Sequence, residues 1–335
     1  MRVLFILKKQ GLYAEYGYSI TGSGLYNSAI FCVDMLNNIL GFDVKIVLVD
    51  DNNGIDREVA AFRPEIVIIE SLWVVPTKFP ILTALYPKVT WIVRNHSAIP
   101  FLAHEGNAMN WLLKYAITGG VLIAHNDQQT LKSFNDLTGT QGLSLPNYYP
   151  TNIEHSKPRY KNQSTIHVGC FGAIRLQKNQ LLQAVAAIRY ANAKRKNLVF
   201  HINSSRVEGG DNILKNIQAL FSVYPQHELQ EHQWLAREDF LSLMRTMDAH
   251  MQVSMSETFN IVTADAVVNN VPVVVSREIP WVEKKFQAKT TDCRDIINRL
   301  DLALTNRRDR RGNINNLYER SNQAVSAWQD ALAAI

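Results

Sequence analysis

Two acidic residues in the second half of the chain are the side chains best suited to chemistry. Glu257 lies in the polar turn of SMSETFN, and Asp265 follows eight residues later in a helical pattern. If a helix begins near Asn260, both carboxylates can point toward the same end of a sheet. A carboxylate can accept two hydrogen bonds from a diol, which is one task that such side chains perform.

A second group of candidates follows the strand pattern IHVGCFGA. Gly169 and Gly172 flank the end of that strand, where a missing side chain lets the backbone approach a ligand. Arg175 and Lys178 come next and can pair with phosphate oxygens. A helix beginning near Asn179 would add its free amide groups, so this stretch is suited to binding an anion.

These residues need elements that bring them together. Short apolar runs alternate with amphipathic stretches of helical length, and apolar residues on both faces of a strand predict a parallel sheet covered by helices. Strands are expected at 2–7, 44–49, 65–70, 89–93, 121–125, 143–145, 166–171, 198–202, 227–232, 250–255 and 271–276. The predicted fold class is α/β, with two Rossmann-like domains whose parallel sheets face a central cleft.

The length of 335 residues favours two domains over one. We expect an N-terminal domain at 1–147, a linker at 148–165 and a C-terminal domain at 166–312. Prolines and polar residues without periodicity indicate the linker. Residues 313–335 form an amphipathic helix pattern that could pack back on the N-terminal domain.

Composition limits the partners. Residues 1–150 hold 11 Lys and Arg against 12 Asp and Glu, and the remainder holds 24 against 18, so an anion is expected in the second half. The sequence has no basic stripe with interleaved aromatic residues, so nucleic-acid binding is not expected. No apolar run reaches the length of a membrane span, and we expect a cytoplasmic protein. The three cysteines are far apart, which indicates neither disulfides nor a clustered metal site.

The stretch GCFGAIRLQKNQLLQAVAAI, followed by SMSETFNIVTADAVVNNVPVVVS, resembles the second domain of retaining GT-B glycosyltransferases of family 4, also called group 1. The resemblance covers most of the chain. It implies a hexosyltransferase whose first domain binds an acceptor, such as a glycan, and whose second domain binds a nucleoside diphosphate sugar.

The resemblance also implies roles for single residues. Arg175 and Lys178 would stabilise the leaving diphosphate, Glu257 would contact the donor sugar, and Asp265 would bind the ribose hydroxyls. The implied donor-binding residues are Gly22, Gly24, Gly172, Thr258, Phe259, Asn260 and Asp265.

Several positions depart from the common pattern of this family. Asp265 stands where glutamate is usual, so ribose contact needs a closer helix or a water. Thr258 and Asn260 stand where glycines are usual, which reduces the freedom of the backbone to approach a sugar. Ala173 stands where arginine is usual, and Arg175 lies nearer to the lysine instead.

The first domain carries fewer signals. In TGSGLYNSAI, Gly22 and Gly24 precede a helix pattern, which resembles the family's loop against the donor phosphates. In WIVRNHSAIP, His96 lies just past a strand end, where the family often keeps a histidine near the donor sugar; His104 is the second candidate. Asp127 is expected to cap a helix.

Two mechanistic expectations follow. No acid pair resembles an Asp-x-Asp metal clamp, so no metal or other cofactor is expected. The resemblance implies retention at the anomeric carbon, with the leaving phosphate taking the acceptor's proton. An inverting reaction would need a base, and the nearest first-domain carboxylates, Glu15, Glu70 and Glu105, stand in no recognisable motif.

Other catalytic classes lack their parts. Motifs of serine hydrolases, P-loop nucleotide triphosphatases and zinc enzymes are missing from the sequence. The residues after the first strand do not fit the dinucleotide fingerprint Gly-x-Gly-x-x-Gly. Two alternatives stay open: a sugar-nucleotide epimerase of the same fold, and a catalytically inactive subunit that binds nucleotide sugars.

Overall fold

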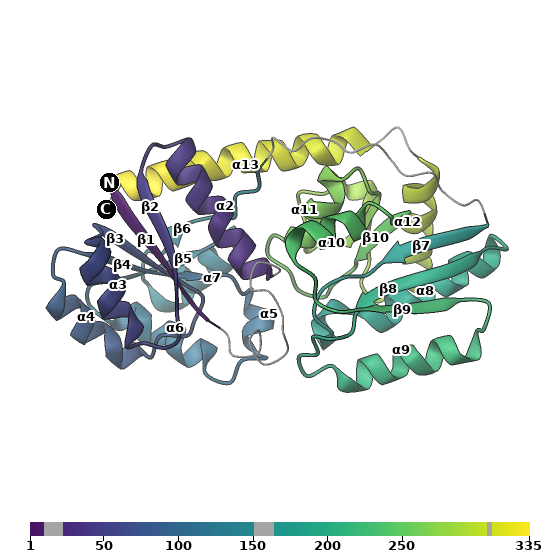
Figure 1. Ribbon diagram of the computed structural model, residues 1–335, viewed down its shortest axis with the longest axis horizontal. Helices are drawn as coiled ribbons and strands as arrows, with labels where there is room; N and C mark the ends of the chain where they lie inside the picture. Colours follow the sequence, from purple (N-terminus) through teal and green to yellow (C-terminus); the bar gives the residue numbers. More distant parts are fainter. Residues whose placement is uncertain (10–22, 151–163, 307–309) are drawn as a thin grey trace. The chain divides into compact units, whose positions relative to one another are not determined.

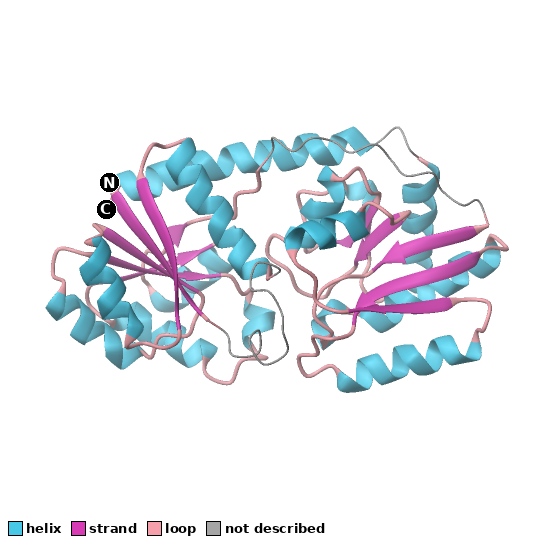
Figure 2. Ribbon diagram, in the orientation of Figure 1, coloured by secondary structure: helices cyan, strands magenta, loops and turns pink. Residues whose placement is uncertain are grey.

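A computed structural model describes residues 1–9, 23–150, 164–306 and 310–335 of the chain. The chain divides into two compact units. The first comprises Met1–Pro150 with Arg320–Ile335, and the second comprises Thr151–Glu319. Each unit contains a six-stranded sheet with helices packed on it, which confirms the predicted α/β class (Figures 1 and 2).

The sheet of the first unit has the strand order β2-β1-β3-β4-β5-β6 and is parallel throughout. In register, Val3 of β1 pairs with Val44 of β2 on one side and with Ile66 of β3 on the other. The strands are β1 (Arg2–Lys8), β2 (Asp43–Val49), β3 (Ile66–Glu70), β4 (Thr90–Asn95), β5 (Val121–His125) and β6 (Leu143–Ser144).

Helices cover both faces of this sheet. Leu4 and Ile6 of β1 point into one core, and Val3, Phe5 and Leu7 point into the other. This alternation explains why the strands read as continuous apolar runs. The helices are α2 (Gly24–Asn38), α3 (Gly54–Phe62), α4 (Phe79–Leu85), α5 (Ile99–Leu102), α6 (Ala108–Ile117) and α7 (Gln128–Thr138), with a 3-10 turn, η2 (Pro76–Lys78).

The sheet of the second unit has the order β12-β11-β10-β7-β8-β9 and is also parallel. Its strands are β7 (Thr165–Gly169), β8 (Asn197–Asn203), β9 (Glu228–His232), β10 (Ala249–Gln252), β11 (Val273–Ser276) and β12 (Gln287–Ala288).

Two groups of helices pack on the second sheet. Helix α8 contacts both α9 and α12, whereas α10 contacts α11, which also contacts β10 and β11. The elements are α8 (Gln180–Ala193), α9 (Asp211–Val223), α10 (Arg237–Met244), α11 (Ile261–Val268) and α12 (Cys293–Thr305), with 3-10 turns η3 (Leu176–Lys178) and η4 (Lys284–Phe286).

Helix α13 (Arg310–Ala333) ends the chain and is divided between the units (Figure 1). Its Asn316 Nδ2 donates to the carbonyl of Trp281 in the second unit, at 3.0 Å. Further along, Ser321 Oγ donates to the carbonyl of Tyr149 at 2.9 Å, and Trp328 is fully buried in the core of the first unit. The last turns of α13 are therefore part of the first unit's core.

Candidate functional site

The order of the second sheet reverses between β7 and β10. From β7 the chain proceeds outward through β8 and β9, and from β10 it proceeds in the other direction through β11 and β12. In open parallel sheets, ligands bind beyond the carboxyl ends of the two strands at such a reversal. Residues 170–179 follow β7 and residues 253–260 follow β10, so these segments define the candidate site.

Lys178 and Glu257 meet at this position. Lys178 Nζ lies 2.6 Å from Glu257 Oε1, and the two side chains are only 14% and 10% exposed. The side-chain oxygen of Gln252, the last residue of β10, accepts from Asn260 Nδ2 at 3.0 Å and lies 3.5 Å from Lys178 Nζ. Two sequence-predicted residues, Lys178 and Asn260, thus face one glutamine that sequence reasoning missed.

The backbone around Lys178 is fixed by the neighbouring segment. Asn179 caps α8 with a left-handed φ of 55°, and its side chain donates to the carbonyl of Val253 at 3.1 Å. The amide of Met255 donates to the carbonyl of Gln177 at 2.7 Å. These bonds tie the two segments at the switch point together, and α8 begins where the sequence predicted.

Asn260 occupies the N-cap of α11. Its φ is 59°, and its side-chain oxygen accepts from the amide of Thr263 at 2.8 Å. Asparagine is among the few residues other than glycine that adopt this left-handed conformation readily. The backbone here therefore takes a conformation that suits glycine, and the asparagine adds a helix cap to it.

Phe259 and Thr258 differ in exposure. Phe259 is 1% exposed, and its ring stacks on Trp281 with centroids 5.9 Å apart. Its carbonyl accepts from Trp281 Nε1 at 2.8 Å. The Phe259 side chain thus packs in the core and does not face the candidate site. Thr258 is half-buried in the turn beside Glu257.

Asp265 is held by an arginine. Arg237, the first residue of α10, places Nη2 at 2.7 Å from Asp265 Oδ1 and Nη1 at 3.4 Å from Oδ2. The Asp265 side chain is 3% exposed and the Arg237 side chain 18%. Sequence reasoning missed Arg237, because nothing near it in the sequence indicates that it pairs with Asp265.

Arg175 belongs to a neighbouring charge cluster. Its Nη1 lies 3.3 Å from Glu208 Oε2, and Arg206 Nη2 lies 2.6 Å from Glu208 Oε1. Burial alone would raise the pKa of Glu208, but Arg175, Arg206 and Lys178 hold it below its usual range. Gly172, at the turn after β7, has a φ of 117° and donates its amide to Asn203 Oδ1 at 2.9 Å.

In the first unit, Gly24 opens α2 after the Ser23 cap, which accepts from the amide of Tyr26 at 3.1 Å. This helix follows β1, and the order of the first sheet reverses between β1 and β3. Gly22 and Glu15, the other predicted residues of this segment, lie outside the described residues. Asp127 caps α7 as predicted, because its side chain accepts from the amide of Thr130 at 2.8 Å.

His96 is bound into a buried charge network at the carboxyl ends of β3 and β4. Its Nε2 bonds to the carboxylate of Glu70, whose other oxygen lies 3.0 Å from Arg94 Nη1. Burial lowers the pKa of His96, so the ring is neutral at pH 7. Burial opposes ionisation of Glu70, yet Arg94 and His96 hold its pKa below the usual value. A neutral His96 therefore donates Nε2–H to Glu70 and keeps Nδ1 as an acceptor.

Four histidines lie on the strands of the second sheet. His201 Nε2 lies 3.0 Å from His167 Nδ1, and His201 Nδ1 lies 2.8 Å from His232 Nε2. His250 stacks on Phe171 with ring centroids 5.9 Å apart. Within the described ranges, no group of His, Cys, Asp and Glu side chains is placed to hold a metal ion.

We expect acid to destabilise the protein through His201 and His250. Burial lowers the pKa of each ring from 6.5 to about 3. Below about pH 6.5 the two imidazole rings bind protons in the unfolded chain but stay neutral in the folded protein. The free energy of unfolding therefore falls as pH falls toward 3. Each ring removes up to about 2 kcal/mol of unfolding free energy between pH 7 and pH 5. Urea unfolding at both pH values measures this change. The His250→Phe variant should lose less unfolding free energy than wild type between pH 7 and pH 5. An equal loss would show that His250 does not contribute to the acid sensitivity.

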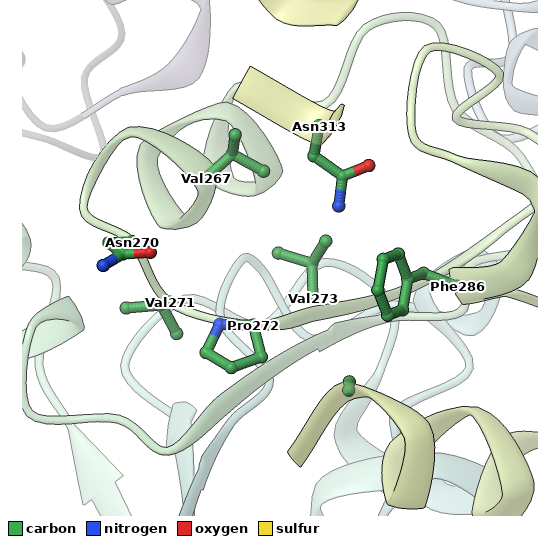
Figure 3. Close-up of a pocket in the computed structure, with 8 residues that line it drawn as sticks. Val267, Asn270, Val271, Pro272, Val273, Phe286 and Asn313 are labelled. Carbon is green, nitrogen blue, oxygen red and sulfur yellow. The ribbon is translucent and has the colours of Figure 1, made fainter. Parts of the chain in front are cut away.

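A small pocket in the second unit lies away from the candidate site. It opens where α11 ends and β11 begins (Figure 3). Its lining residues are Val267, Asn270, Val271, Pro272, Val273, Phe286, Ala303 and Asn313. Lys178 and Glu257 follow carboxyl ends of strands, whereas this pocket lies at the amino end of β11. It is therefore separate from the candidate site.

The fold of this chain is similar to that of several solved structures. No protein-family model matches the chain, and no curated protein matches its sequence. An α,α-trehalose-phosphate synthase (UDP-forming) from Burkholderia vietnamiensis is 11% identical, with a TM-score of 0.70 over 100% of this chain and 96% of that one. HepE from Anabaena, in complex with UDP and glucose, is 13% identical, with a TM-score of 0.67 over 99% and 98%. The apo structure of OtsA is 10% identical, with a TM-score of 0.67 over 99% and 98%.

None of the described helices is both long and apolar enough to cross a bilayer. The similarity to solved structures extends over nearly the whole chain, at identities that establish fold alone. The sheet orders and the structural similarity together show that the chain has the GT-B fold, with two Rossmann-like units.

Proposed function

We propose that the chain is a retaining glycosyltransferase that moves a sugar from a nucleoside diphosphate sugar to an acceptor without a metal ion. The observation that carries this proposal is the contact of 2.6 Å between Lys178 and Glu257 at the switch point of the second sheet. The UDP and glucose bound to HepE and the UDP-forming synthase are consistent with a nucleotide-sugar donor.

Lys178 would hold the diphosphate. One N–H of its ammonium group points at Glu257 and a second lies near Gln252, which leaves the third for a phosphate oxygen. Helices α8 and α11 begin at Gln180 and Ile261, beside Lys178 and Glu257, and their first amides add donors. Lys178, Arg175 and these helix ends would together neutralise the leaving group, the task that a metal ion performs elsewhere.

Glu257 would hold the donor sugar. Its Oε1 accepts from Lys178, and no residue in the described part of the chain donates to its Oε2. Oε2 is therefore placed to accept from a sugar hydroxyl. Within the first unit, His96 and the start of α2 at Gly24 are the residues proposed to contact a donor.

Retention needs no protein base. The leaving phosphate oxygen would take the acceptor's proton on the face from which it departs. Glu70 is fully buried and bound to Arg94, so it is poorly placed to deprotonate an acceptor. Glu105 is exposed on the turn before α6. Of the candidate bases that lie within the described residues, Glu70 is thus unsuited to an inverting reaction, which supports the proposal of retention.

A donor panel tests the proposal. We expect one class among UDP, GDP, ADP and CDP sugars to raise the melting temperature of the full chain, measured in EDTA, because a ligand that binds only the folded state stabilises it. The same donor should then release its nucleoside diphosphate in EDTA. Proton NMR of the first-formed sugar product should show the anomeric configuration of the donor.

Four outcomes would overturn parts of the proposal. Loss of activity in EDTA with rescue by manganese would exclude the metal-free mechanism. A product of opposite anomeric configuration would exclude retention. Donor binding without any turnover would favour the inactive binding subunit, and conversion of the donor to its epimer would favour the epimerase.

A further inference from the structure

We infer that Arg237, oriented by Asp265, is the residue through which this chain binds the ribose hydroxyls of the nucleotide. The inference rests on the proposed function and adds a residue that neither the motif pattern nor the fold assigns. Both oxygens of Asp265 face the guanidinium, at 2.7 and 3.4 Å. Arg237 is the more exposed partner, at 18% against 3%.

Burial decides which partner can reach a ligand. The Asp265 carboxylate is enclosed and already accepts from Arg237, so it offers little surface to a ribose. A guanidinium carries five N–H donors in one plane, more than its two contacts with Asp265 use, and its exposed edge can donate to hydroxyl oxygens. The charges of the pair offset each other, which suits a neutral diol better than a diphosphate.

The position along α11 fits the nucleotide. Asn260 caps the helix beside Lys178, where the diphosphate is proposed to bind. Asp265 lies five residues further along, about 7.5 Å from the cap along the helix axis at 1.5 Å per residue. In a nucleotide the ribose is attached directly to the first phosphate, so its hydroxyls lie at a comparable distance from the diphosphate.

The packing of α10 on α11 does not depend on Arg237 alone. Arg245, just after α10, donates Nε to Asn269 Oδ1 at 2.9 Å, a second arginine tie to the residue that follows α11. Met244 is fully buried, and Phe240 packs edge-on against Phe171 at 5.3 Å. Arg245 therefore supplies a matched control, since it joins the same two helices away from the candidate site.

The test is calorimetric binding of UDP, GDP, ADP and CDP to the full chain, each beside its 2′-deoxy counterpart. Wild type should bind one ribonucleotide about tenfold to a hundredfold more tightly than the deoxy form. Arg237→Ala should weaken ribonucleotide binding by about that factor, leave deoxynucleotide binding nearly unchanged, and so abolish the preference. Arg245→Ala should keep it.

A second variant protects the test against misfolding. Arg237→Lys retains the charge opposite Asp265 but loses the planar fork, so it should melt like wild type and still lose the 2′-hydroxyl preference. An unchanged preference in this variant, or an equal loss in Arg245→Ala, would overturn the inference. If wild type binds no nucleoside diphosphate at all, the proposed function itself fails.

Discussion

Replacing Lys178 by alanine should lower the turnover of the donor about 100-fold to 1000-fold while the protein stays folded. The leaving diphosphate gains negative charge in the transition state, and the Lys178 ammonium group is the cation at the switch point where that charge is proposed to develop. The measurement is the initial rate of nucleoside diphosphate release at saturating donor, together with the melting temperature of the variant.

Lys194 provides the control for this result. It lies at the other end of α8 from Lys178, half-exposed, with Nζ 2.6 Å from Asp301 Oδ1. Lys194→Ala should leave turnover unchanged. Unaltered turnover in Lys178→Ala would remove Lys178 from the site, and equal losses in both variants would indicate a general effect on the second unit.

Replacing Glu70 by glutamine should destabilise the first unit by about 3–5 kcal/mol. Glu70 and Arg94 are both fully buried, and the arginine also donates to the carbonyl of Leu145 at 2.9 Å and to Asn147 Oδ1 at 2.7 Å. Glutamine keeps the volume but removes the charge, which leaves a buried guanidinium without its counter-ion. Urea unfolding followed by tryptophan fluorescence measures the loss.

The double variant Glu70→Gln/Arg94→Met separates charge from packing. If the uncompensated guanidinium causes the loss, removing it should recover part of the stability lost in Glu70→Gln. A double variant as unstable as the sum of the single variants would contradict this explanation. Asp136→Ala, which removes an exposed partner of Lys132, should leave unfolding unchanged.

The strands could be predicted because their signal is local. A strand buried on both faces needs an almost continuous apolar run, and such a run can be recognised without knowing its neighbours. Strand ends were harder to predict. The strand expected at 250–255 ends at Gln252, since the amide of Val253 donates to Gln183 Oε1 at 2.8 Å instead of continuing the ladder. Gln183 lies 70 residues away in sequence.

The same limit explains which site residues were found. Lys178 and Glu257 stand in motifs that carry their own signal, and the structure brings them together. Arg237 lies 28 residues from Asp265, and nothing within either segment indicates the pairing. Gln252 was read as an ordinary strand residue, although its amide connects Asn260 with the carbonyl of Phe171. Partner residues of this kind become visible only when the strands are placed side by side.

The division of α13 between the units bears on the order in which the chain can mature during synthesis. The first unit needs Trp328, which lies 5.9 Å from Phe5 between ring centroids and 5.1 Å from the Arg94 guanidinium. Residues 1–150 therefore leave the ribosome with part of their core exposed, whereas the second unit is continuous in sequence. Domains generally fold as units as they emerge, so the later unit can complete its core before the earlier one. The core of the first unit is complete only after the last turns of α13 have been synthesised and have packed onto it.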